Sequence, residues 1–302
     1  MDEQLDRLGT EGWRRDLADL DLRDTEGMVR AMNAADAEVH VAVAAAAPAI
    51  AAAVDGIAAR LTSDGRLFYV GAGTPGRLGE LDAYECPPTF NVDDGTLVAL
   101  VAGAGLTGRA REGAEDDGAA GAADLAAHDV GPGDAVVAST ASGRTPYVLG
   151  AIAHARRAGA LTVGVVNNPD SPLSSEVDVA IEVLTGAEVI LGSTRLKAGT
   201  AQKMVLNMLS TLAMVRAGHT FGNLMIDVRA DNDKLRARAA TMVGLAAGVP
   251  AGDAAAALAA SDFQTRTAVV ALAAELEPAE ARELLAAHGG DLRRTMSSLG
   301  RG

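Results

Sequence analysis

Short apolar runs alternate with helix-compatible segments through the middle of the chain, and this alternation restricts the possible folds more than any other feature. The runs comprise residues 67–70, 97–101, 135–139, 161–166 and 179–183, with helices predicted near 76–84, 107–126 and 145–158. Short strands that alternate with helices are typical of a mainly parallel sheet covered by helices on both faces. The sequence therefore predicts an α/β fold built on such a sheet.

Helical segments flank the alternating region on both sides. Apolar residues recur at helical spacing from residue 25 to residue 61, with an interruption at Pro48, which predicts two helices. A long helix is predicted from residue 197 to 217, and the chain past Asp231 is alanine-rich, with helix breaks at 248–250, 261–265, 277–278 and 289–290. We expect an N-terminal arm with helices (1–60), an α/β domain (61–230) and a small helical C-terminal subdomain (231–302).

Charge and cysteine content narrow the function classes. The formal net charge is −14, so a nucleic-acid-binding surface is not expected, and a bound phosphate must be held locally. Cys86 is the only cysteine, which excludes an intramolecular disulfide and fits a reducing compartment. The N-terminus has no signal-like segment and the alanine-rich run at 41–54 contains Pro48, so the sequence predicts a cytoplasmic protein that does not enter a membrane.

Two turns rich in glycine and hydroxyl groups follow predicted strands. They are GAGTPG at residues 71–76 and STASGRTPY at residues 139–147. Glycines let the backbone approach a ligand closely, and the free N–H groups at a helix start attract anions. Ser142, Gly143 and Thr145 are candidate phosphate contacts, although hydroxyl groups at a helix start are also ordinary caps. Neither turn matches a Walker loop or a complete dinucleotide fingerprint, so a sugar phosphate is the better candidate ligand.

Two charged blocks add further candidates. The segment GAEVILGSTRLKAGTAQK at residues 186–203 gathers Glu188, Ser193, Thr194, Arg195 and Lys197 before the long helix. Its cations could close over an anion or hold the loops together. The acidic segment REGAEDD at residues 111–117 is, by itself, typical of a solvated helix face.

Several strings in these blocks resemble one family. They are ECPPT at 85–89, EGAED at 112–116, ASGRTPY at 141–147, STRLKAGTAQK at 193–203 and FGNLMIDV at 221–228. Together they are similar to the N-acetylmuramic acid 6-phosphate etherase family, which are sugar-isomerase (SIS) domain proteins related to the glucokinase regulatory protein. The resemblance covers roughly residues 60–300 and implies a SIS-type sugar-phosphate domain at 61–230.

The resemblance also implies an activity. Members of the family cleave the lactyl ether of N-acetylmuramic acid 6-phosphate, which gives N-acetylglucosamine 6-phosphate and D-lactate in the recycling of cell-wall sugars. The implied enzyme needs neither a metal nor an organic cofactor. It is a homodimer in which each subunit helps to complete the pocket of the other.

Residue roles follow from the same resemblance. Glu85 is implied to protonate the leaving lactate and Glu115 to act as the base, whereas Glu112 is set aside because of its position in the motif. Two carboxyl groups suit this chemistry, because neighbouring carboxylates push their pKa values apart. The implied sugar-phosphate contacts are Gly73, Thr74, Ser142, Gly143, Thr145, Glu188, Ser193, Thr194 and Lys197.

The chain departs from the family pattern near these strings. The changed positions are Pro75 in place of a serine, Glu80, Tyr84, and Leu191 in place of a hydroxyl residue. Near the N-terminus, TEGWRRDLADLDL lacks the asparagine and serine of the family string TExxNPxSxxID. Two alternatives therefore stay open, namely a lyase or isomerase for a different sugar or sugar phosphate, and a non-catalytic sugar-phosphate sensor. The presence of both glutamates favours an active lyase.

Overall fold

The structure is a computed structural model that describes residues 8–105 and 113–301. The chain divides into two compact units. The first comprises Met1–Tyr84 and Gly95–Ala213, and the second comprises Glu85–Asp94 and Met214–Gly302. The second unit thus takes in a segment from the middle of the chain together with the C-terminal helices. The predicted boundaries at residues 60 and 230 stay predictions.

The first unit is built on a parallel sheet, which has five strands in the described part of the chain. They are β1 (Leu67–Gly71), β2 (Leu97–Val101), β3 (Ala135–Ser139), β4 (Leu161–Val166) and β5 (Val179–Glu182), in the order β2-β1-β3-β4-β5. The strands read as continuous apolar runs because the sheet is buried from both sides. The predicted α/β fold with a mainly parallel sheet is confirmed.

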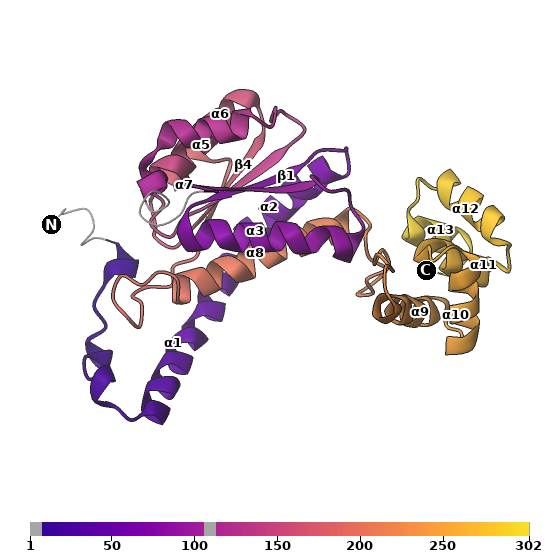
Figure 1. Ribbon diagram of the computed structural model, residues 1–302, viewed down its shortest axis with the longest axis horizontal. Helices are drawn as coiled ribbons and strands as arrows, with labels where there is room; N and C mark the ends of the chain where they lie inside the picture. Colours follow the sequence, from indigo (N-terminus) through magenta and orange to yellow (C-terminus); the bar gives the residue numbers. More distant parts are fainter. Residues whose placement is uncertain (1–7, 106–112, 302) are drawn as a thin grey trace. The chain divides into compact units, whose positions relative to one another are not determined.

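Helices cover both faces of this sheet, as Figure 1 shows. One face carries α5 (Gly118–Ala126), α6 (Pro146–Ala158) and α7 (Pro172–Glu176). The other carries α2 (Ala47–Leu61), α3 (Gly73–Phe90) and α8 (Lys197–Arg216). On this second face Asp82 of α3 accepts hydrogen bonds from the hydroxyl groups of Tyr69 (2.7 Å) and Ser210 (3.1 Å), so one buried carboxylate links β1, α3 and α8.

The N-terminal segment forms short turns and then two helices. The turns are η2 (Gly9–Glu11), η3 (Arg15–Leu17) and η4 (Leu20–Leu22), and the helices are α1 (Thr25–Ala45) and α2. The predicted pair of helices is confirmed, but the break falls at Ala46 and Pro48 lies in the first turn of α2. Proline is tolerated there because a first-turn residue has no intrahelical partner for its N–H group.

The structure agrees with the predicted helices α6 and α8 within one residue at each end and corrects two others. Helix α3 is longer than predicted, since it begins within the glycine turn and ends at Phe90 after including Pro87 and Pro88. The prediction of one continuous helix at 107–126 is corrected within the described residues, where the helix is interrupted before Gly118. Residues 106–112 lie outside the described residues, a 3-10 turn η5 (Ala114–Asp116) follows, and α5 begins after Asp117, whose side chain caps it by accepting the N–H of Ala120 at 2.9 Å.

The second unit contains short helices around a core of its own. They are α9 (Asp233–Ala247), α10 (Ala251–Ala260), α11 (Thr265–Ala274), α12 (Pro278–Ala287) and α13 (Leu292–Ser298), with breaks where the sequence predicts them. Arg266 of α11 donates to Asp227 and to the carbonyl groups of Gly218 (3.0 Å) and Gly290 (2.5 Å). This side chain therefore joins three segments of the unit that are far apart in sequence.

Among the helices of the described residues, none is by itself long and apolar enough to cross a membrane. The pairs α1 with α2 and α9 with α10 reach the required length and composition only together, and they are bent by 60° and 111°.

Candidate functional site

Two loops meet at the carboxyl edge of the sheet. Strands β1 and β3 pair in parallel with Gly71 opposite Ser139, so the turns that follow them begin side by side. The carboxyl ends of strands are where open α/β sheets bind ligands. The two turns singled out in the sequence therefore share one edge of the first unit.

The loop at residues 139–145, which we name the hydroxyl loop, contains four hydroxyl side chains, and three of them form hydrogen bonds within the loop. Thr140 and Thr145 are joined through their Oγ1 atoms at 2.7 Å, and Ser142 Oγ accepts the N–H of Arg144 at 3.2 Å. Thr145 stands at the N-cap position of α6 but its side chain makes no cap hydrogen bond. Its hydroxyl group thus serves the loop rather than the helix, which removes the ordinary capping explanation for this residue.

Gly143 is required by the path of the hydroxyl loop. Its φ is +68°, in the left-handed region that favours glycine. A Cβ atom at this position would lie 2.2 Å from Oγ of Ser171. The loop can therefore fold this tightly against the segment before α7 only with glycine here.

The glycine turn at residues 71–76 leads directly into α3. Gly73 has a φ of +57° and is exposed, and Thr74 follows it in the first turn of the helix. A Cβ atom on Gly199 would meet Cγ2 of Thr74 at 3.4 Å, so Thr74 lies close to the start of α8. Pro75 also occupies the first turn of α3, where its missing N–H group costs the helix no hydrogen bond.

Glu188 and Lys197 are bound within the first unit. Glu188 is 1% exposed, and its carboxylate accepts the N–H groups of Lys197 (2.8 Å) and Ala198 (2.9 Å), the first two of α8. The Nζ atom of Lys197 donates to Glu38 (2.6 Å) and to the carbonyl of Ala187 (3.1 Å). These are contacts that hold loops together, and a role of either residue toward a ligand stays a prediction. Ser193 and Thr194 are half-buried in the loop between them.

The two candidate catalytic glutamates are both exposed. Glu115 lies in η5 of the first unit, where partial removal from water and then the charge of Asp116 raise the pKa of its carboxyl group. Glu85 lies in α3 within the second unit, and its carbonyl accepts the hydroxyl of Thr89 at 2.7 Å. Glu112 lies outside the described residues. The acid and base roles of Glu85 and Glu115 stay predictions.

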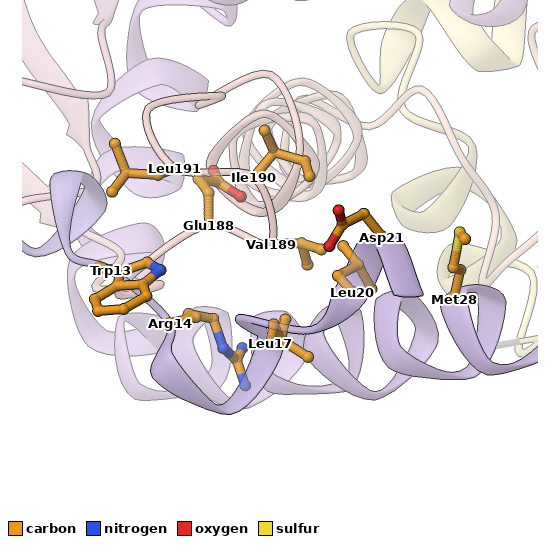
Figure 2. A pocket seen from close by; sticks show the side chains of 10 residues that line it. All are labelled: Trp13, Arg14, Leu17, Leu20, Asp21, Met28, Glu188, Val189, Ile190 and Leu191. Carbon is orange, nitrogen blue, oxygen red and sulfur yellow. The ribbon is translucent and has the colours of Figure 1, made fainter. Parts of the chain in front are cut away.

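A pocket of about 500 Å³ lies between the N-terminal segment and the loop before α8. Figure 2 shows the side chains that line it: Trp13, Arg14, Leu17, Leu20, Asp21, Met28, Glu188, Val189, Ile190 and Leu191. Trp13 is 62% exposed and Leu191 is 55% exposed. The sequence predicted an N-terminal arm at 1–60 but no role for it in the site. Leu191, one of the departures from the family pattern, faces this pocket.

No metal centre is visible in residues 8–105 and 113–301, where no three acidic, histidine or cysteine side chains gather as ligands. Hydroxyl and backbone N–H groups, such as those of the hydroxyl loop, can donate to an anionic substituent. Hydroxyl groups and carboxylates can bind the hydroxyl groups of a sugar. The arrangement therefore suits a sugar with an anionic substituent.

Curated relatives match nearly the whole chain. An N-acetylmuramic acid 6-phosphate etherase from Streptomyces coelicolor is 51% identical over 298 residues, which cover 98% of this chain and 95% of the relative. An enzyme of the same name from Rubrobacter xylanophilus is 54% identical over 292 residues, covering 95% and 96%. Another from Salmonella choleraesuis is 51% identical over 276 residues, covering 91% and 93%.

Family models and solved structures agree with this likeness. The model of the SIS domain matches residues 117–212, and that of the glucokinase regulatory protein N-terminal SIS domain matches residues 29–156. A phosphoheptose isomerase from Francisella tularensis shares the fold, with a TM-score of 0.50 at 15% identity over 63% of this chain and 98% of its own. Since etherases that are about half identical match more than nine-tenths of the chain, the protein belongs to the N-acetylmuramic acid 6-phosphate etherase family of SIS-domain proteins.

Proposed function

We propose that Glu85 and Glu115 carry the acid and base steps of the etherase reaction in this protein. As a carbon–oxygen lyase of this family, the chain cleaves the D-lactyl ether of N-acetylmuramic acid 6-phosphate and gives N-acetylglucosamine 6-phosphate and D-lactate. The observation that carries the residue roles is the joint presence of ECPPT and EGAED in a chain of such high identity to etherases.

The reaction starts on the open-chain sugar, in which the C2 hydrogen lies next to the C1 aldehyde. Glu115 takes the C2 proton, and the electron pair of that bond forms the C2–C3 double bond as the C3–O bond breaks. Glu85 gives its proton to the departing ether oxygen, so lactate leaves with a neutral hydroxyl group. Water then adds at C3 of the unsaturated aldehyde. The proton held by Glu115 returns to C2 and the proton lost by water restores Glu85.

The surroundings of Glu115 support its role as the base. A carboxylate is a weak base at its ordinary pKa, and a raised pKa brings it closer to the working pH. The pKa of Glu115 is raised by partial loss of water contact and by the negative charge of Asp116. Ser142 and Thr145 in the hydroxyl loop, with Gly73 and Thr74 in the turn beside it, are the proposed contacts of the 6-phosphate.

The test is D-lactate release from N-acetylmuramic acid 6-phosphate by the purified protein. We expect Glu85→Gln and Glu115→Gln each to lower kcat by about 10²–10⁴-fold, the usual contribution of a positioned acid or base. Glu112→Gln is the matched control, since it makes the same change in the same motif and is expected to keep activity. Wild-type rates in Glu85→Gln or Glu115→Gln would show that the assignment of that residue is wrong.

A changed substrate is the second candidate, because apolar Leu191 faces the pocket of Figure 2. Lactate release from N-acetylmuramic acid, without the phosphate, separates the two. The etherase reading predicts a strong preference for the 6-phosphate, since the hydroxyl loop is the proposed contact of that phosphate. Equal rates on both compounds would favour the second candidate.

We also infer a cytoplasmic homodimer. Helix α1 extends away from the sheet in Figure 1, and it exposes Val29 (61%), Met32 (39%) and Val41 (61%). Exposed apolar side chains on one element support an interface. A charged sugar phosphate does not cross a membrane unaided. The enzyme is therefore expected in the compartment where its substrate is phosphorylated, which supports the cytoplasm. Sedimentation at micromolar concentration is expected to give the mass of a dimer, and Val29→Glu with Met32→Glu a monomer. A wild-type protein that sediments only as a monomer would contradict the inference.

A further inference from the structure

Two buried asparagines lie against the hydroxyl loop. Asn167 and Asn168 directly follow β4 and are 2% and 0% exposed. The backbone N–H of Asn167 (3.1 Å) and Nδ2 of Asn168 (2.9 Å) both donate to the carbonyl of Ala141. Because Ala141 stands between Thr140 and Ser142, whatever holds its carbonyl also sets the direction of the neighbouring hydroxyl groups.

The N-terminal segment joins this contact through Thr10. Oδ1 of Asn168 accepts the N–H of Thr10 at 3.3 Å, and Nδ2 of Asn168 donates to Oγ1 of Thr10 at 3.0 Å. Thr10 is 1% exposed. A side-chain amide has two N–H donors, and those of Asn168 are directed to Thr10 and to Ala141. One amide group therefore connects η2 to the hydroxyl loop.

Asn167 supports the same place from the other side. Its Nδ2 atom donates to the carbonyl of Val183 at 3.0 Å, and its Oδ1 atom accepts Nε2 of Gln202 at 2.9 Å. Gln202 belongs to α8 and Val183 directly follows β5, so Asn167 is held by these two segments as well as by the loop. Thr10 is the hydrogen-bond partner that the N-terminal segment supplies to Asn168.

We propose that Thr10 and Asn168 are positioning residues for phosphate recognition, acting through the carbonyl of Ala141 on the hydroxyl loop. The identity of the ligand as a sugar phosphate rests on the proposed function. Without the Asn168 amide, Ala141 keeps only the N–H of Asn167, and one bond does not fix the rotation of the peptide. Without the Thr10 hydroxyl, the Asn168 amide loses one of the three hydrogen bonds that orient it.

The experiment measures binding of N-acetylglucosamine 6-phosphate by calorimetry. Thr10→Val, which keeps the shape and the N–H group, and Asn168→Ala are each expected to weaken binding by about 10-fold, as for one lost hydrogen bond. Binding of unphosphorylated N-acetylglucosamine is expected to change by less than about twofold, and in lactate release KM rises while kcat stays within about twofold. Thr10→Ser, which keeps the hydroxyl group, is expected to restore wild-type binding.

Thr162→Val is the matched control for a general loss of stability. Thr162 is also buried and lies near the opposite end of β4, where its hydroxyl donates to Asp178 at 2.8 Å. We expect it to lower Tm without changing sugar-phosphate affinity. The proposal is overturned if Thr10→Val and Asn168→Ala both keep wild-type affinity, or if Thr162→Val weakens binding as much as they do. A wild type that binds the sugar phosphate but releases no lactate would contradict the proposed function alone, since the calorimetric comparison still decides this inference.

Discussion

At the scale of single residues, Glu115 combines exposure with a perturbed carboxyl group. It stands in a 3-10 turn beside Asp116, and its pKa lies above the ordinary value of 4.5 because of partial removal from water and the neighbouring charge. A base must be unprotonated to act, so the rate should rise with pH through this raised pKa. The position of that acidic limb therefore reports the environment of Glu115.

We expect Asp116→Asn to move the acidic limb of kcat/KM to lower pH, because it removes a negative charge that raises the pKa of Glu115. The measurement is the pH dependence of lactate release by the wild type and the variant. Glu112→Gln serves as the comparison, because it removes one negative charge from the same EGAED motif. A limb that stays in place or moves to higher pH in Asp116→Asn would argue against Glu115 as the base.

At the scale of elements, the start of α8 depends on one buried carboxylate. Glu188 accepts the first two N–H groups of the helix, which have no intrahelical partners, and its negative charge faces the positive end of the helix dipole. We expect Glu188→Ala to lower the free energy of unfolding by about 2–3 kcal/mol, since it leaves buried donors unpaired. Glu188→Gln should cost less, because its amide oxygen still accepts one of these bonds. Urea denaturation measures both, and an unchanged midpoint in Glu188→Ala would contradict the capping role.

At the scale of the whole molecule, the free energy of unfolding is expected to fall at acid pH. Burial alone would raise the pKa values of Asp134 and Glu38, yet hydrogen bonds from Arg66 to Asp134 and from Lys197 to Glu38 lower them. A carboxyl group with a lowered pKa contributes stability that is complete above its ordinary pKa, here 3.8 and 4.5, and that is lost as the pH falls through the folded value.

Tm is therefore expected to be constant above about pH 5 with respect to these two groups and to fall below it. Asp134→Asn should lower Tm at neutral pH and flatten its dependence between about pH 4 and pH 2, because the variant has no proton to gain at this position. Thermal denaturation across this range tests the expectation. Full acid dependence in Asp134→Asn would assign the effect to other carboxyl groups.

Local patterns in the sequence were sufficient for the architecture and for the family. Strand limits, the parallel sheet and helices α6 and α8 depend on periodicity and turn residues within a few positions, and the ECPPT and EGAED strings are contiguous. The start of α5 was missed because Asp117 is an N-cap that also reads as part of an acidic run. The described structure leaves the acid and base roles of the two glutamates as predictions.

The contacts of the polar side chains, in contrast, depend on how distant segments pack together. The sequence allowed Thr145 to be a helix cap and Lys197 to bind an anion, whereas the folded chain pairs Thr145 with Thr140 and Lys197 with Glu38, which is 159 residues away. Thr10 and Asn168 are similarly separated by 158 positions. The physical reason is that periodicity and propensity act over one or two turns of chain, while a buried donor takes whichever acceptor the packing brings within reach.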